Sequence, residues 1–230
     1  MYHIGLGTSK RGGELIVRGA LVKEGSAAAR DAMQRWSRPR DASYSARARS
    51  LLARALLRRL LAESTGAPSG WTFDVDISGQ PVARLRCGGR APSITISHSG
   101  GWVACAVANG GQIGIDIEVC RPGRDIMGIA GLAFGPGERR DVEREGAVAF
   151  YRVWTLREAL AKARGRGLAQ VADGIDRIER SPADGLQLRR IGDEAWWLAH
   201  ATPVEGLTLA LAFRCSRCSS VPSISWSLWP

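Results

Sequence analysis

The sequence lacks the features of several common protein classes. No run of about 20 apolar residues occurs in it, so no membrane-spanning helix and no membrane partner are predicted. The amino-terminal segment MYHIGLGTSKRGG has no apolar stretch long enough for a signal peptide, and we therefore expect a cytoplasmic protein. The chain has neither a G-x-S-x-G nucleophile elbow nor a Walker A phosphate loop. The sequence therefore does not indicate a serine hydrolase of the elbow type or a P-loop nucleotidase.

Cysteine is sparse and follows no metal or disulfide pattern. Cys87, Cys105 and Cys120 are scattered through apolar or strand-like segments, and Cys215 and Cys218 form a single C-x-x-C pair. A zinc site of this type needs a second pair or histidines beside the first, and neither is present at a suitable spacing. We expect all five thiols to be reduced.

Acidic residues are fewer than basic ones. Asp and Glu number 22 against 32 for Lys and Arg, which gives a formal net charge of +10, nearly all of it from arginine. Such a charge attracts nucleic acid, membrane surfaces, phosphorylated cofactors or acidic proteins, and a GC-rich genome would produce the same composition. No helix-turn-helix, zinc-finger or RNP signature accompanies the charge, so nucleic acid is not the expected partner.

Helical and strand-like patterns alternate along the chain. Residues 24–40 end in SRPRD, which predicts a loop, and apolar spacing predicts helices over about 46–63 and 145–164. WTFDVDISGQP predicts a strand leading into a turn at Gly79 and Pro81. SITISHSGGWVACAVANGGQIGIDIEV predicts two strands that form a hairpin with its turn at NGG. Further signals predict a loop, a short helix and a Gly/Pro break within 121–140, and an antiparallel sheet over 171–213.

This order of helices and strands predicts an α+β fold with two similar halves. The boundary between the halves is expected near Gly110 or Gly111, which gives an N-terminal lobe over 1–111 and a C-terminal lobe over 112–215. The last residues, 216–230, match no element and are predicted to form a mobile tail.

The most informative segment for chemistry is the strand Gly114-Ile115-Asp116-Ile117-Glu118. Strand residues two apart point to the same side, so Asp116 and Glu118 project together, while Ile115 and Ile117 face the other, apolar side. Two carboxylates on one face repel each other unless a cation neutralises them, and Mg²⁺ prefers such oxygen ligands. The alternative is an edge strand with a solvated acidic face.

A second candidate segment lies on the later helix, from Trp154 to Lys162. Glu158 and Lys162 are four residues apart and share one helix face. Taken alone, this spacing favours a surface ion pair. The functional alternative makes Glu158 a third metal carboxylate and Lys162 a neighbour of phosphate.

Two segments in the first half could contact an anion. Ser97-His98-Ser99-Gly100 follows the apolar strand SITI, and hydroxyls, backbone N–H groups and a histidine at a strand end can hold phosphate. A single histidine is more often a structural hydrogen-bonding group. Arg49 falls on the apolar side of the helix predicted over 46–63, where it either extends to solvent or points at an anionic ligand.

In this order, the segments resemble those of the surfactin-type (Sfp-type) 4′-phosphopantetheinyl transferases. The family pattern consists of an SHS element, a G-[IV]-D-x-E strand, and a W-x-x-K-E-x-x-x-K helix followed by G-x-G-L. The matching residues are Ser97–Ser99, Gly114–Glu118, Trp154–Lys162 and Gly165–Leu168, and Phe134–Glu138 matches an F-x-x-x-E element. The resemblance covers about residues 36–213, nearly the whole chain.

The resemblance implies an enzyme that moves 4′-phosphopantetheine from coenzyme A to a serine of an apo acyl or peptidyl carrier protein and releases 3′,5′-ADP. It implies a monomer with two pseudo-symmetric lobes, each a small antiparallel sheet packed on a long helix, and an active site in the cleft between them. Asp116, Glu118 and Glu158 match the metal ligands for Mg²⁺, with Mn²⁺ as a substitute. Glu158, or a water it orients, is the candidate acceptor of the serine proton, and neutral Lys162 is the alternative.

The resemblance also implies contacts with coenzyme A. Arg49 matches a basic residue near the 3′-phosphate, the Gly79–Pro81 turn matches a segment beside the adenine, and the residues expected at the phosphates are Ser97, His98, Arg157 and Lys162. Two departures from the family pattern affect these expectations. Arg157 replaces a family lysine, and Arg38 and Arg40 stand in for missing upstream lysines.

The expected protein partner is acidic. Ile126, Met127, Ile129 and Leu132 could dock a carrier protein within a basic rim of Arg121, Arg124, Arg139 and Arg140, or they could simply cover the core of the second lobe. The alternative functions are a non-catalytic coenzyme A or carrier-protein binding relative, prompted by Arg157, and a basic nucleic-acid-binding module.

Overall fold

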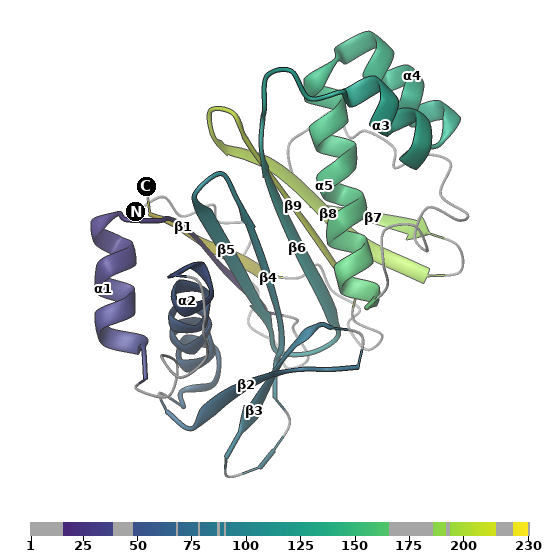
Figure 1. The fold of residues 1–230 in the computed structure, drawn as a ribbon. Coiled ribbons are helices and arrows are strands. Elements are labelled where there is room, and N and C mark those ends of the chain that lie inside the picture. Colours follow the sequence, from purple (N-terminus) through teal and green to yellow (C-terminus); the bar gives the residue numbers. More distant parts are fainter. Residues whose placement is uncertain are drawn as a thin grey trace. The chain divides into compact units, whose positions relative to one another are not determined.

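The computed structural model describes residues 16–38, 48–67, 69–77, 79–86, 88–89, 91–165, 186–191, 194–214 and 223–229. Helices and strands mix along the chain and form several small sheets, which confirms the predicted α+β class (Figure 1). The chain divides into two compact units, Met1–Ile113 with Cys215–Pro230 (unit 1) and Gly114–Arg214 (unit 2). Over the described ranges, no helix is both long and apolar enough to span a membrane.

Unit 1 is built on a four-stranded sheet in the order β10-β1-β5-β4. The strands are β1 (Ile16–Lys23), β4 (Ser93–Ser99), β5 (Trp102–Ala108) and β10 (Ser223–Trp229). Neighbouring strands are antiparallel, except that β10 runs parallel to β1.

Two helices and a hairpin complete unit 1: α1 (Ala27–Trp36), α2 (Ala48–Thr65), β2 (Trp71–Val75) and β3 (Pro81–Leu85). The helix predicted over 46–63 is confirmed as α2, which buries Leu52, Leu56 and Leu60 in a core shared with β1, β4 and β5. The sequence predicted a loop only for SRPRD at the end of 24–40, and the helix α1, which precedes that segment, was not predicted. Ser26 caps α1 by accepting a hydrogen bond from the Ala29 N–H.

The prediction of a hairpin turn at NGG is wrong. The turn lies earlier, at Gly100 and Gly101, and joins β4 to β5. Both glycines have positive φ angles of 54° and 80°, as the two central residues of a tight hairpin turn of this kind require. NGG instead connects β5 to β6 (Gln112–Val119), which is a strand of a different sheet.

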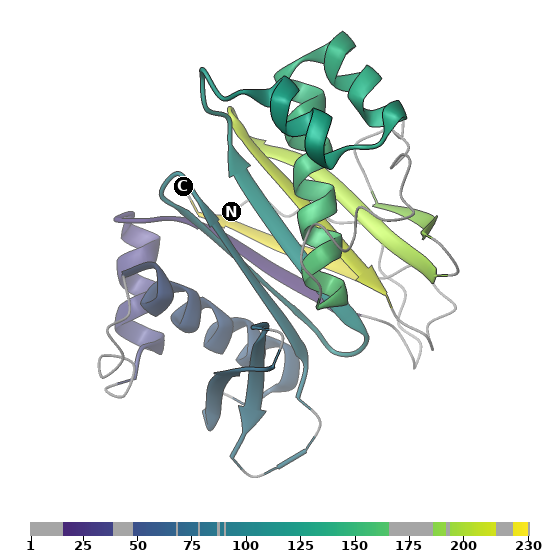
Figure 2. The same ribbon diagram turned by 45° about the vertical axis from the view of Figure 1, so that its right-hand side comes forward.

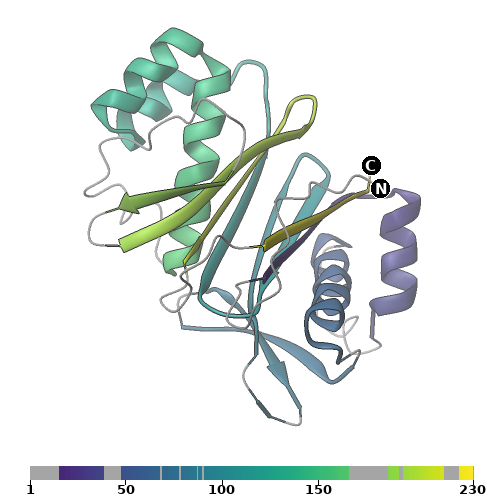
Figure 3. The ribbon, with the colours of Figure 1, turned by 180° about the vertical axis from the view of Figure 1, so that it is seen from behind.

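The prediction of a mobile tail over 216–230 is also wrong for residues 223–229. These residues form β10, paired along its length with β1 (Figure 3). Ile224 is buried, and the Trp226 ring lies over Gly19, where an added Cβ atom would come 2.1 Å from the ring. A side chain at Gly19 would therefore displace Trp226, so the glycine makes room for the terminal strand.

Unit 2 holds a second four-stranded sheet, in the order β6-β9-β8-β7, which confirms the sheet predicted late in the chain. Its later strands are β7 (Leu186–Ile191), β8 (Glu194–Val204) and β9 (Leu207–Arg214). The helix predicted over 145–164 is confirmed as α5 (Ala147–Arg164), which lies along this sheet (Figure 2). Leu156 and Leu160 of α5 pack with Trp196 and Leu198 of β8 in the core.

Two short helices precede α5. The first confirms the predicted short helix, the Gly/Pro break lies between the two, and the second helix was not predicted. They are α3 (Ile126–Ala133) and α4 (Pro136–Glu145). Asp125 caps α3 through the Gly128 N–H, and Pro136 occupies the first turn of α4, where its missing N–H is not needed. Phe134 and Phe150, with ring centroids 5.6 Å apart, join these helices to the start of α5.

Candidate active site

A glycine brings the strand β6 into direct contact with the helix α5. A Cβ atom on Gly114 would lie 2.0 Å from the Ala159 carbonyl oxygen and 2.5 Å from the Ala163 nitrogen. Only glycine permits such a close approach of two backbones. Because strand residues two apart share a face, Asp116 and Glu118 follow Gly114 on the side of β6 that meets α5.

Asp116 meets a lysine at this contact. Its side chain is buried, and its Oδ1 accepts a hydrogen bond from Lys162 Nζ at 2.7 Å. Ile115 and Ile117 are buried as well, so the strand has apolar side chains on one face and acidic ones on the other. The structure therefore joins two motif segments that lie 46 residues apart.

Glu158 belongs to the same group of charges. Its pKa lies above the ordinary glutamate value, first because the side chain is largely buried and next because the Asp116 carboxylate repels its charge. Lys162 lowers this pKa and Glu118 raises it further, so the charges of three neighbouring side chains act on Glu158. The predicted carboxylates and lysine thus form one electrostatic cluster, which we call the α5–β6 cluster.

A metal site is not preassembled here. No group of three or more His, Cys, Asp or Glu side chains in the described part of the chain is placed to hold a metal ion. The donor chemistry of Asp116, Glu118 and Glu158 nevertheless fits Mg²⁺, since the cation prefers oxygen ligands and would remove the repulsion that raises the Glu158 pKa.

The structure does not bring Arg157 to the α5–β6 cluster. Its Nε and Nη2 atoms donate to Glu138 Oε2 of α4 at 2.8 and 2.6 Å, and the two side chains are 1% and 0% exposed. The guanidinium also lies over the Phe134 ring, with 5.8 Å between Cζ and the ring centroid. Both ends of the F-x-x-x-E element therefore contact Arg157, which joins α4 to α5 inside the core.

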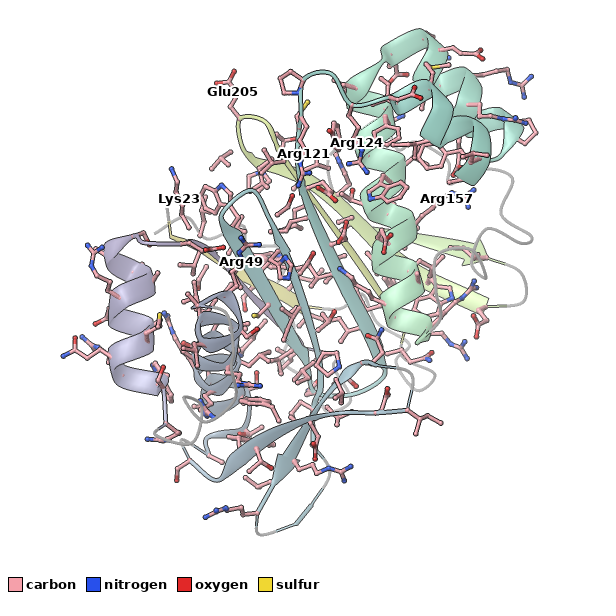
Figure 4. The ribbon with its side chains drawn as sticks, viewed as in Figure 1. Lys23, Arg49, Arg121, Arg124, Arg157 and Glu205 are labelled. Carbon is pink, nitrogen blue, oxygen red and sulfur yellow. The ribbon has the colours of Figure 1, made fainter. Side chains whose placement is uncertain are left out.

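Arg124 also contacts aromatic rings, near the start of α5. Its Cζ atom lies within 5.1 to 5.7 Å of the ring centroids of Phe150, Tyr151 and Trp154 (Figure 4). Stacking on three rings holds the loop between β6 and α3 against α5. Arg124 is half-buried against these rings, and its place in a basic rim around a docking surface stays a prediction.

The SHS element lies in unit 1, at the end of β4. Cys105 of β5 faces α2, because its thiol donates to the Ala53 carbonyl, and Val103 shares that face. His98 pairs with Val103 and therefore lies on the α2 side, where it is exposed. Ser97 is buried on the opposite face, so the two residues do not present one surface to a phosphate.

Arg49 lies in the first turn of α2 and is partly exposed. Its Nε atom is 2.8 Å from Glu24 Oε1, in an ion pair within unit 1. Glu24 follows β1 directly, and its N–H donates to the Gly101 carbonyl of the β4–β5 turn at 2.7 Å. Sequence reasoning missed Glu24, and its position beside a strand end and a turn gives no local signal for this contact.

The remaining predicted residues have simpler positions. The turn before β3 is confirmed, with Gly79 at a φ of 82° and its N–H bonded to the Asp76 carbonyl, and with Pro81 opening the strand. Cys105 and Cys120 are free, and burial raises the pKa of the Cys105 thiol. Arg38 follows α1 and is exposed. The other predicted positions, Arg40, Cys87, Cys215, Cys218 and Arg166–Leu168, lie outside the described residues.

Comparisons with known proteins agree with this arrangement. Residues 112–212, which include the α5–β6 cluster, match a family model described as the 4′-phosphopantetheinyl transferase superfamily. The 4′-phosphopantetheinyl transferase HetI of Nostoc sp. is 32% identical over 171 residues, which cover 72% of this chain and 70% of that protein.

Two relatives from Bacillus subtilis are also similar. A 4′-phosphopantetheinyl transferase is 34% identical over 134 residues, covering 55% of this chain and 56% of its own length. The 4′-phosphopantetheinyl transferase Sfp is 37% identical over 84 residues, covering 35% of this chain and 36% of its own length. The resemblance drawn from the motifs is confirmed: this chain belongs to the 4′-phosphopantetheinyl transferase superfamily, and it is an enzyme of that class.

Proposed function

We propose that the enzyme transfers 4′-phosphopantetheine from coenzyme A to a serine of an apo acyl or peptidyl carrier protein. The observation that supports this most strongly is the α5–β6 cluster, in which Lys162 donates to Asp116 and the charges of Asp116, Glu118 and Lys162 all act on Glu158. Membership of the superfamily gives the reaction class, and the cluster supplies acidic and basic groups suited to it.

In the proposed reaction, the serine oxygen attacks the β-phosphorus of coenzyme A. A new P–O bond forms to the serine, the bond from that phosphorus to the bridging oxygen breaks, and 3′,5′-ADP leaves with the electron pair. Glu158, or a water that it orients, accepts the serine proton as the general base. Lys162 donates to Asp116 and is placed to neutralise phosphate charge rather than to take up a proton.

Mg²⁺, or Mn²⁺ in its place, would be held by Asp116, Glu118 and Glu158 and would neutralise charge on the pyrophosphate. The remaining coenzyme A contacts are proposed from the family resemblance. Arg49 is assigned to the 3′-phosphate and His98 to a phosphate, with the Gly79–Pro81 turn beside the adenine. Ser97 and Arg157 are left out of this set, because both side chains are buried and Arg157 is paired with Glu138.

The carrier protein is proposed to dock on α3. Leu132 is 93% exposed and Met127 46%, while Ala130 is buried and Ile126 and Ile129 pack against the core. One side of α3 therefore covers the core, and the other presents large apolar side chains to solvent. Arg121 and Arg140 are exposed nearby in the sequence and would favour an acidic carrier.

Leu132→Asp provides a test of this surface. It should raise the KM for the carrier protein and leave that for coenzyme A unchanged, because Leu132 lies outside the α5–β6 cluster. Arg35→Glu, on exposed α1, serves as a charge control. Equal effects on both KM values would place the docking surface elsewhere.

We further propose a monomeric, cytoplasmic enzyme, for which size-exclusion chromatography and cell fractionation are the tests.

The experiment that tests the function combines the purified protein, an apo carrier protein, coenzyme A and Mg²⁺. Intact-protein mass spectrometry should show the carrier gaining the phosphopantetheine mass only when all four are present. Several carriers of the fatty-acid, polyketide and peptide types should be tried. If a folded protein binds coenzyme A but modifies none of them, the chain is a non-catalytic binding relative. Strong competition by duplex DNA at physiological salt would favour a nucleic-acid-binding role.

A further inference from the structure

Glu24 connects two segments of unit 1 that are distant in the sequence. Its backbone N–H is bonded to the Gly101 carbonyl, so its position is fixed by the turn that follows the SHS element. Its side chain contacts Arg49, in the first turn of α2. A residue with no place in the family motifs thus joins the turn beside His98 to the arginine assigned to the 3′-phosphate.

The sheet register places these groups at one end of unit 1 and on one side of it. His98, Val103 and Val22 form a row across β4, β5 and β1 on the face that packs against α2. Glu24 comes two residues after Val22, just beyond the end of β1. Arg49 reaches the same end from α2 (Figure 4), and the 2.8 Å ion pair brings its guanidinium to Glu24.

The contact with Glu24 leaves the two terminal nitrogens of Arg49 available to bind a ligand. Glu24 contacts the Arg49 guanidinium at Nε through its own Oε1 atom. This oxygen is buried and has no aligned hydrogen-bond donor, so the attraction between the two side chains is mainly one of charge. The two terminal nitrogens form the planar fork that binds a pair of phosphate oxygens. The Arg49 side chain is 46% exposed, which gives a ligand access to it.

We propose that Glu24 is a positioning residue that orients Arg49 for the 3′-phosphate of coenzyme A, an inference that rests on the function proposed above. A long arginine side chain loses rotamer freedom when it binds a phosphate, and a partner that already holds it reduces that loss. The same carboxylate also repels the bound phosphate, and this repulsion offsets part of the gain from holding the guanidinium in place.

The test measures the dissociation constants of coenzyme A and dephospho-coenzyme A by calorimetry and compares their ratio among variants. Glu24→Ala should lower the preference for coenzyme A by roughly three- to tenfold, the effect of releasing one flexible side chain. Glu24→Gln keeps the shape of the side chain but removes its charge, so it should lower the preference by a similar factor. Asp31→Ala, which breaks the exposed Arg35–Asp31 pair on α1, should leave the ratio unchanged.

Variants of Arg49 separate this inference from the function on which it rests. Arg49→Ala should abolish the preference, and adding Glu24→Ala to it should have no further effect on the ratio. Arg49→Lys, which leaves Glu24 in place, should also lose much of the preference, because lysine lacks the fork. If Arg49→Ala lowers the ratio and Glu24→Ala does not, Glu24 is only structural and the inference is overturned. If Arg49→Ala keeps the wild-type ratio, the phosphate role of Arg49 fails, and the inference fails with it.

Discussion

Two neighbouring residues of α5 have charges in contrasting environments. Arg157 is buried with Glu138, one positive charge against one negative, in contact with Phe134. Glu158, the next residue, belongs to the α5–β6 cluster, where three carboxylates face a single lysine. The buried Arg157–Glu138 pair has equal and opposite charges and joins α4 to α5. The α5–β6 cluster is partly exposed and has more negative than positive charge, so its carboxylates repel one another.

The difference shows which charges on α5 belong to the fold and which are available for chemistry. A buried pair of opposite charges has no net charge left for a ligand. A cluster with excess negative charge binds cations and shifts the pKa of its members, which is typical of functional sites. The pairing of Arg157 with Glu138 also explains why arginine is tolerated in place of the family lysine at position 157, since the Arg157 side chain does not reach the α5–β6 cluster.

Breaking the balanced pair should have the largest effect on stability. Arg157→Met leaves the Glu138 carboxylate buried without its partner, and we expect a loss of roughly 3–5 kcal/mol in the free energy of unfolding. Urea denaturation followed by circular dichroism measures it. The double variant Arg157→Met with Glu138→Met replaces both charges with apolar groups and should recover most of the loss. A single variant as stable as wild type would show that the pair contributes nothing to the fold.

Gly114→Ala should have the next largest effect. The added methyl group would lie against the backbone of α5 at Ala159, so helix and strand must separate, at a cost of about 1–3 kcal/mol. The same separation should weaken the Lys162–Asp116 contact and reduce transfer. Gly131→Ala on exposed α3, where nothing lies within 4 Å of the new methyl, is the control and should be neutral or slightly stabilising. Equal melting temperatures for both variants would contradict the close approach.

Changes within the α5–β6 cluster should have smaller effects on stability, of opposite sign. In the presence of a chelator, Asp116→Ala removes the partner of Lys162 and should lower the free energy of unfolding by about 1 kcal/mol or less. Glu158→Gln removes a repelled charge and should raise the melting temperature at pH 7. Differential scanning calorimetry of both variants checks the signs, and a destabilised Glu158→Gln would contradict the repulsion.

The pH dependence follows from the same residue. Because the Glu158 pKa is higher in the folded protein than in the unfolded chain, the folded state binds the extra proton. Its contribution to stability is complete below the ordinary glutamate pKa and is lost as the pH rises through the raised value. As the pH rises between those two pKa values, the free energy of unfolding of the metal-free wild type should fall relative to that of Glu158→Gln. Parallel melting curves across this range would rule out a raised pKa.

Much of the α5–β6 cluster could be predicted from local periodicity. Strand alternation placed Asp116 and Glu118 on one side, and helix spacing placed Glu158 beside Lys162. Spacing within one helix could not show that Lys162 donates to Asp116, because that contact depends on how closely β6 approaches α5. The reason for the close approach, Gly114, is visible in the sequence only as one glycine among 28.

The errors came from contacts between distant segments. The turn was expected at NGG because Gly100-Gly101 lies within a longer strand-like run, and both dipeptides are suitable for a hairpin. The terminal strand shows an apolar alternation at Ile224, Trp226 and Leu228, yet its partner β1 lies at the other end of the chain. Arg157 was assigned to a ligand by analogy, whereas its helix position directs it to Glu138.

The most direct test of the contrast between Arg157 and Glu158 is the rate of phosphopantetheine transfer to an apo carrier protein per folded enzyme molecule, measured for two matched variants. Glu158→Gln should fold at least as well as wild type and lose transfer by about a hundredfold or more, as expected for a removed general base. The double variant Arg157→Met with Glu138→Met should transfer at close to the wild-type rate. A folded Glu158→Gln enzyme with wild-type transfer, or a folded double variant without any, would contradict the account.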